Sequence, residues 1–327
     1  MKKFRELKDK KDEKFKNVNY LKLKEFTWNK DINKDKVEQY LKKLDEPFVI
    51  RNYYNAAAVK NWNEDTIADI FGDLILPIEV YTSELSYYNA NKSDIVKELT
   101  VRDYMEHMKN VEKPPYYYLA EVDLYEKMND PAMSTYILND TYNENEDKND
   151  HQVESLYMGY YTTSGCHIHI EEDYVLNQVV GTKEVIMFDY HANEEHLTRK
   201  SLFDTAGNFI KDDFFELDHN KLNSLYKVIL NPGDSLFIPP WWYHTVRGSK
   251  FSCSITRIHH RNNWEYTYKP SIKLTLILLY LQAYFFSEWN FQAIFKEYSF
   301  CILIFIITLV LFYSLFYKKQ LFTIYNG

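Results

Sequence analysis

The sequence predicts a mainly β protein with flanking helices, built as an antiparallel sandwich or small barrel and followed by a C-terminal transmembrane helix. Short β-rich segments separated by turn residues dominate residues 155–260, which is typical of antiparallel sheets. Tyrosine (29) and phenylalanine (21) are frequent and glycine (8) is scarce, a composition that suits strands with aromatic packing. An uncharged run at residues 299–317 supplies the membrane segment.

Helix patterns and β-rich runs alternate in the first part of the chain. Residues that favour helix ends bound two of the helices, namely Asn61 or Asn63 before the second, Gly72 after it, and Thr100 before the third. The expected helices lie at residues 34–44, within 59–73 and at 99–110, and the expected strands lie at 45–54, 76–83 and 114–122.

Residues 139–152 have no apolar period, and we expect them to form a surface loop. Beyond this loop the chain alternates between short β-rich runs and turns. The expected strand segments are residues 155–165, 166–172, 174–190, 226–246 and 251–260.

The C-terminal part predicts a membrane anchor. At 1.5 Å per helical residue, residues 299–317 extend about 28 Å, which is enough to cross a hydrocarbon core. The apolar segment within 269–298 is shorter and predicts an interfacial or re-entrant helix. We therefore expect a charged lead-in at 1–18, a main domain at 19–268, a single membrane span, and a short tail at 318–327. Lys318 and Lys319 favour a cytosolic tail, whereas tail anchoring would place the main domain on the cytosolic side, which is the orientation that we expect.

Charge and cysteine content exclude several classes. A net charge of -8 without a continuous basic stripe argues against direct nucleic-acid binding. The three cysteines form no CxxC pair and are too few for a disulfide framework, which favours a reducing compartment. The N-terminus lacks the apolar core of a signal peptide.

The stretch CHIHIEE carries the candidate metal ligands. If it is a strand, His167, His169 and Glu171 point to one side of it. Because a strand rises by about 3.3 Å per residue, His167 and Glu171 are about 13 Å apart and cannot bind one ion unless the strand breaks. Residues two apart can do so, and His169 belongs to both pairs.

A third ligand comes from the stretch NPGDSLFIPPWWYH, in which a turn, an apolar strand and a rigid proline pair lead to His244. A His-x-carboxylate pair with a distant histidine is the usual facial triad of Fe(II) oxygenases. This chemistry favours His169, Glu171 and His244 as metal ligands, and the alternative set is His167, His169 and His244. Lys183 lies in the next expected strand, where a buried lysine would need an anion such as a dicarboxylate, although a surface position remains an alternative.

These stretches together resemble the JmjC and cupin-like Fe(II)/2-oxoglutarate hydroxylases. The likeness covers residues 19–264, and its most specific stretch is LNPGDSLFIPPWWYHTVRGSKFSCSI. The resemblance implies a double-stranded β-helix, or jelly-roll, barrel. It also implies that His244 is the distal metal ligand and that Lys183 binds the far carboxylate of 2-oxoglutarate. Ser164 would assist that carboxylate, and Asn177 would be a further polar contact to the co-substrate.

The chain departs from the family pattern near the first ligand. If His169 is the first ligand of the family pattern, Glu171 is the carboxylate ligand. If His167 is the first ligand, Ser164 fits the family spacing better, but all three ligands are imidazoles. A His-x-His start also resembles the ordinary cupin metal motif, in which Asp173 would complete a four-ligand site.

The expected function is an Fe(II)- and 2-oxoglutarate-dependent dioxygenase that hydroxylates a protein side chain. The alternatives are a membrane-tethered, non-catalytic metal-binding protein and a metal-dependent enzyme acting on small molecules.

Overall fold

The computed structural model describes residues 18–260 with internal gaps. The gaps are residues 42–44, 55–59, 84–85, 88–92, 94, 124–152, 170–171, 194–209, 211–213 and 215–216. The described residues all belong to one unit of the chain, which ends at residue 267. The lead-in up to residue 17 and the expected loop at 139–152 lie outside the described residues.

The expected membrane anchor also lies outside them. Within the described part of the chain, none of the helices has the length and apolar character that a membrane span requires. The apolar segment 269–298, the span 299–317 and the tail 318–327 are not described, so the anchor stays a prediction.

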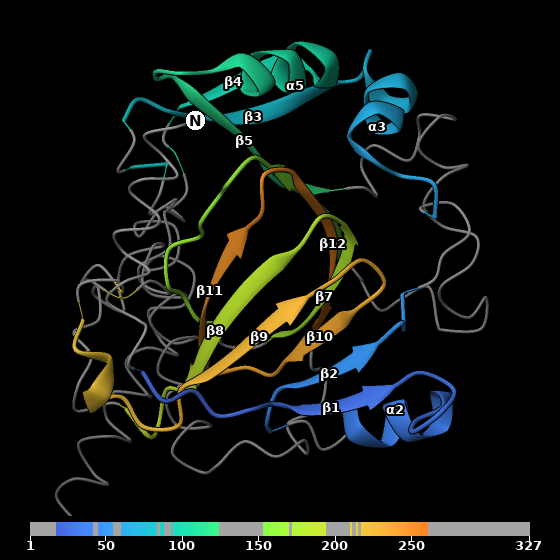
Figure 1. Ribbon diagram of the computed structural model, residues 1–327, viewed down its shortest axis with the longest axis vertical. Helices are drawn as coiled ribbons and strands as arrows, with labels where there is room; N and C mark the ends of the chain where they lie inside the picture. Colours follow the sequence, from blue (N-terminus) through green and yellow to red (C-terminus); the bar gives the residue numbers. More distant parts are fainter. Residues whose placement is uncertain are drawn as a thin grey trace, which may run out of the picture. The chain divides into compact units, whose positions relative to one another are not determined.

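Two β-sheets dominate the described residues (Figure 1). The larger sheet, in spatial order, contains β1 (Lys24–Thr27), β2 (Phe48–Arg51), β10 (Ser235–Ile238), β7 (Glu172–Val180), β12 (Ser252–His260), β6 (Val153–Gly159), β5 (Tyr116–Asp123), β3 (Ile75–Tyr81) and β4 (Val96–Thr100). The smaller sheet contains β11 (Trp242–Gly248), β8 (Lys183–Asp189) and β9 (Tyr226–Leu230). Neighbouring strands are antiparallel except β1 and β2.

Residues 163–169 extend the smaller sheet along the free side of β11. Isolated bridges join Thr163 to Arg247 and His167 to His244, both antiparallel. Between the two bridges, the segment advances four residues from Thr163 to His167, whereas β11 spans only three residues from His244 to Arg247. The segment therefore contains a bulge. From β6 to β12, the chain therefore crosses between the larger and smaller sheets in the order of a jelly roll.

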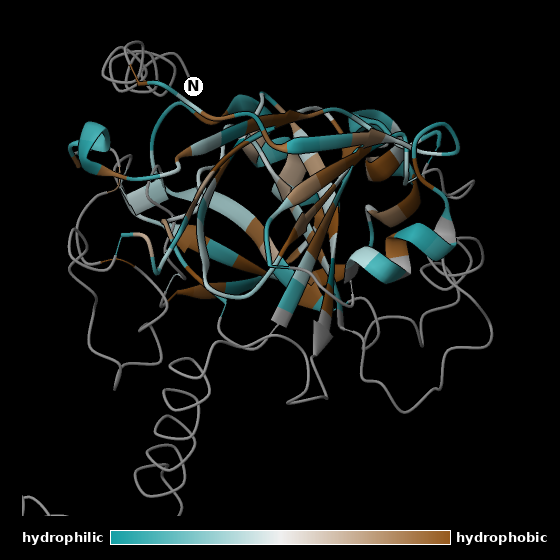
Figure 2. Ribbon diagram, turned by 90° about the horizontal axis from the view of Figure 1, so that it is seen from below, coloured by the Kyte–Doolittle hydropathy of each residue, from teal (hydrophilic) through white to brown (hydrophobic). Residues whose placement is uncertain are grey.

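The apolar core lies between the two sheets. Leu176 and Leu236 of the larger sheet pack with Val185, Met187 and other residues of the smaller sheet. Because side chains alternate along a strand, Val175 points to the other face of β7, where it packs with Phe48 and Phe237. This alternation defines an inner face toward the barrel and an outer face. In Figure 2 the strands at the centre carry much of the apolar colouring.

Three α-helices and one short 3₁₀ helix are described, and the α-helices begin near the expected residues. They are α2 (Lys34–Leu41), α3 (Glu64–Phe71), α5 (Val101–Asn110) and η4 (His219–Lys221). Asn63, not Asn61, is the N-cap of α3 and forms a reciprocal capping box with Thr66, while Thr100 caps α5 as predicted. Gly72 follows α3 with a right-handed backbone, φ -54°, so it does not end the helix by a left-handed turn. A Cβ there would lie 2.2 Å from the Ala68 carbonyl oxygen, which explains the need for glycine.

Candidate metal centre

His167 and His244 are direct neighbours across two antiparallel segments. The His167 N–H donates to the His244 carbonyl (3.0 Å), and the His244 N–H donates to the His167 carbonyl (2.8 Å). Such a pair places both side chains on the same face of the sheet. On β11 this is the inner face, because Trp242, two residues before His244, packs in the core between the sheets. The ring centroids of the two histidines are 4.2 Å apart.

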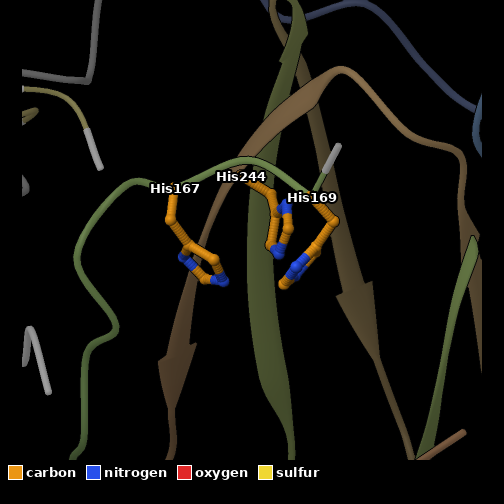
Figure 3. A group of neighbouring side chains, drawn as sticks. All are labelled: His167, His169 and His244. Atoms are coloured by element: carbon orange, nitrogen blue, oxygen red, sulfur yellow. The ribbon is translucent and has the colours of Figure 1, made fainter. Parts of the chain in front are cut away.

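His169 joins this pair from two residues further along. Its carbonyl accepts a hydrogen bond from the Trp241 N–H (2.8 Å), which keeps this part of the chain beside the start of β11. The His169 ring centroid lies 5.0 Å from those of His167 and His244. One ring nitrogen from each of the three histidines lies within 4.8 Å of the others, and the rings converge in Figure 3. The predicted alternation of the CHIHIEE stretch is therefore right for its two histidines.

Backbone carbonyls orient two of the rings. His167 Nδ1 lies 2.8 Å from the Gly165 carbonyl oxygen, and His244 Nδ1 lies 3.0 Å from that of Trp242. Because a carbonyl oxygen only accepts, each Nδ1 carries the proton, and each Nε2 keeps a lone pair for a metal. The His169 ring stacks on Tyr174, with centroids 3.4 Å apart. Three neutral nitrogen ligands thus face one another.

Burial keeps the imidazoles neutral. It lowers the pKa of His167, although the Gly165 carbonyl and the Glu121 carboxylate act in the opposite direction. It also places the pKa of His169 well below its ordinary value, as does repulsion from the other two histidines. The pKa of His244 is lowered well below its ordinary value by burial and by His167. Neutral imidazole is the form that binds metal, so the group is ready to bind at neutral pH.

The structure brings together the alternative ligand set, His167, His169 and His244. Glu171 of the favoured set lies outside the described residues, so its role stays a prediction. Asp173 does not join the histidines. It precedes Tyr174 on β7 and therefore points to the outer face, which makes the four-ligand alternative through Asp173 wrong. Three imidazoles suit Fe(II), Zn(II) and other divalent transition metals.

Lys183 lies at the other end of the barrel. It is 4% exposed and shares the inner face of β8 with Val185 and Met187, so the expectation of an inward lysine is right. Its ammonium group donates to the Ser254 hydroxyl and lies 5.7 Å from the centre of the Tyr157 ring. The described residues pair no carboxylate with this amine. Because burying an uncompensated ammonium is costly, this end of the barrel is suited to an anion.

Ser164 and Asn177 lie in different environments. The Ser164 hydroxyl oxygen accepts a hydrogen bond from the Val246 N–H (2.9 Å), which holds Ser164 beside β11. The proton of the Ser164 hydroxyl is left for another acceptor. Asn177 accepts a hydrogen bond from the Ser235 hydroxyl (2.6 Å) and shares the outer face of β7 with Val175. The structure does not bring Asn177 to the histidines, so its position does not support contact with a co-substrate.

Two tyrosines at the site were not identified from the sequence. Tyr174 stacks on His169, and Tyr157 lies against Lys183. Because side chains alternate along a strand, the sequence could have indicated that both tyrosines point into the barrel. No sequence pattern, however, pairs Tyr174 with His169. Their contacts depend on how the strands are placed in space.

This fold and this site together define a β-barrel protein of the jelly-roll class with a candidate metal centre. Comparison with known families makes the assignment specific. Residues 34–265 match the family model described as "Cupin-like domain", and the chain belongs to that family. The chain is also similar to the JmjC domain-containing protein A of Dictyostelium discoideum, with 24% identity over 245 residues, covering 69% of this chain and 92% of that relative. The JmjC and cupin-like resemblance is confirmed.

Proposed function

We propose that this protein is an Fe(II)- and 2-oxoglutarate-dependent dioxygenase that hydroxylates a protein side chain. One observation carries the proposal. The barrel interior holds three convergent imidazoles at one end and a buried amine with no carboxylate partner among the described residues at the other. His244 pairs with Met187 and Lys183 pairs with Gly248, so four strand residues, about 13 Å, separate the two levels. A lysine side chain and a five-carbon dicarboxylate together can span that distance.

Separate residues would bind the metal and the co-substrate. His167 and His244 would hold Fe(II) through their Nε2 atoms and His169 through a ring nitrogen, and carbonyl hydrogen bonds would keep the rings of His167 and His244 in place. Bound Fe(II) would supply open positions for 2-oxoglutarate and dioxygen, as in facial-triad oxygenases. Lys183 would hold the far carboxylate, with the Ser254 hydroxyl orienting its amine. The Ser164 proton is available for the same carboxylate.

The proposal includes a polypeptide substrate and a membrane anchor at residues 299–317 with the barrel on the cytosolic side. The uncharged run between Lys296 and Glu297 on one side and Lys318 and Lys319 on the other supports the anchor.

A second candidate has one observation in its favour. The described ligand set is all imidazole, whereas the usual Fe(II) triad includes a carboxylate. This favours a cupin that binds metal without using 2-oxoglutarate, either as a scaffold or as an enzyme acting on small molecules.

Succinate formation separates the two candidates. The full chain, loaded anaerobically with Fe(II) and then given oxygen and 2-oxoglutarate, should form succinate, which NMR detects, and a His244→Ala variant should not. A protein that binds Fe(II) or Zn(II) tightly but neither binds 2-oxoglutarate nor forms succinate would contradict the proposal and support the second candidate.

The affinity for 2-oxoglutarate should depend on pH through Lys183. Burial lowers the pKa of Lys183 to about 8, partly offset by Cys253. Below this pH the amine is charged and attracts a carboxylate, and above it the charge is lost. We therefore expect a nearly constant Kd below pH 8 and a rise of about tenfold per pH unit above it. Fluorescence titration of the Zn(II)-loaded protein measures this, and a Kd that stays flat above pH 8 would contradict the role of Lys183.

A further inference from the structure

A groove of about 650 Å³ lies on the outer side of the larger sheet, between β1, α2 and the residues that lead into β2. Its size is within the range of ligand sites. Phe26, Ile32, Tyr40, Pro47 and Phe48 form its apolar part. Lys24, Asp31, Lys36, Gln39, Asp45 and Glu46 supply the polar part. The groove is separate from the metal centre, which faces the inside of the barrel.

The aromatic wall of this groove already holds an ammonium group. Lys24 Nζ lies 4.5 Å from the centre of the Tyr40 ring and 5.2 Å from that of Phe26. It also donates a hydrogen bond to the Tyr40 hydroxyl (2.7 Å). Tyr40 packs in turn against Phe26 and Phe48. The wall therefore presents ring faces of the kind that attract organic cations.

Two carboxylates stand beside this wall, and no described residue supplies them with a counter-ion. Asp45 and Glu46 are exposed, and neither forms an ion pair with another described residue. Ring faces next to unpaired carboxylates match a guanidinium group, which stacks on aromatic rings and binds carboxylates through two parallel hydrogen bonds.

Asp45, which lines the groove, contacts the metal end of the barrel. The Trp242 indole N–H donates to the Asp45 carbonyl (2.9 Å), and His244 follows two residues later on β11. Tyr226 packs against Trp242. The pKa of Tyr226 is raised first by burial and then by the Glu46 and Asp189 carboxylates, so both carboxylates lie near this end. A polypeptide that reaches the metal centre at this end would pass Asp45 and Glu46.

We propose that the groove binds an arginine side chain of the polypeptide substrate, next to the residue that the substrate presents to the metal. This inference rests on the proposed function, because it names the substrate class of the same site. The guanidinium group takes the place of the exposed Lys24 ammonium group at the Tyr40 ring and pairs with Asp45 and Glu46.

Peptide binding tests the proposal independently of turnover. A fluorescein-labelled peptide of glycine, alanine and two arginines is titrated with the full chain and followed by fluorescence anisotropy. The matched peptide carries citrulline, which has the shape of arginine without its charge. We expect the arginine peptide to bind more tightly and to weaken as salt is added. A double variant, Asp45→Asn with Glu46→Gln, should weaken its binding roughly fivefold to tenfold.

A control variant removes the same charge elsewhere. Asp69 on α3 and Glu98 on β4 are exposed, and Asp69→Asn with Glu98→Gln should leave peptide binding unchanged. Equal binding of the two peptides, or an unchanged affinity in the Asp45 and Glu46 variant, would overturn the inference. Succinate formation by the wild type without peptide is measured in parallel. Its presence with no arginine preference would reject the groove alone, and its absence with a clear arginine preference would reject the oxygenase alone.

Discussion

Replacing His244 by alanine should weaken the binding of a divalent transition metal by roughly a hundredfold or more. His244 is 3% exposed, and its ring lies within 5.0 Å, centre to centre, of both other histidines. Alanine removes one of the three nitrogen ligands that the described residues bring together. Calorimetric titration with Zn(II), or the visible spectrum of bound Co(II), measures the loss.

The same titration decides the ligand register. If the three histidines hold the metal, His167→Ala and His169→Ala should both weaken binding as strongly as His244→Ala, and Glu171→Ala should have little effect. The favoured sequence-based set predicts the reverse for His167 and Glu171. His107→Ala is the control, because His107 lies on α5 and its ring contacts the Pro115 carbonyl oxygen and Tyr117. Undiminished binding in all three site variants would reject the metal centre.

Removing the Lys183 amine should have the second largest effect. Lys183→Met keeps most of the side-chain volume and removes the charge, and Lys183→Ala removes both. Each should weaken 2-oxoglutarate binding to the metal-loaded protein by roughly a hundredfold, because a buried charge-assisted hydrogen bond is lost and the carboxylate is left unpaired. Metal affinity should not change, since Lys183 lies four strand residues from the level of His244.

A surface lysine near the same end of the barrel serves as the control. Lys250 is exposed in the turn between β11 and β12, and Lys250→Met should bind 2-oxoglutarate like the wild type. The melting temperature of Lys183→Met should be maintained or raised, because a buried charge without an anion is removed. Unchanged 2-oxoglutarate affinity in both Lys183 variants would remove the assigned role.

Local patterns were enough to predict most elements of the barrel. Thr100 begins α5 as expected, because a side-chain oxygen that accepts a free helix N–H acts within one turn of chain. The turns at Gly181 and Gly233 have positive φ, 68° and 92°, which glycine adopts at little cost. Both are local properties that a sequence displays directly. The choice between Asn61 and Asn63 as the α3 cap could not be made, since either residue type can cap and one contact distinguishes them.

The candidate site was predicted only in part. His169, His244 and Lys183 carry patterns that suggested their roles, and all three point into the barrel. Asn177 and Asp173 were assigned from the resemblance to the JmjC and cupin-like proteins, and the outer face of β7 excludes Asp173 from the histidine group. Successive residues of a strand point to opposite faces. An error of one residue in the assumed register therefore places a side chain on the wrong face.

The sequence by itself determined a mainly β chain with two histidines on one side of a short segment, because strand alternation is a property of consecutive residues. Tertiary structure decided that His167 and His244 are cross-strand partners, that Tyr174 stacks on His169, and that the Lys183 amine lies in the barrel beside Ser254. The physical reason is that these contacts join residues far apart in the chain, and their register depends on the packing of two whole sheets.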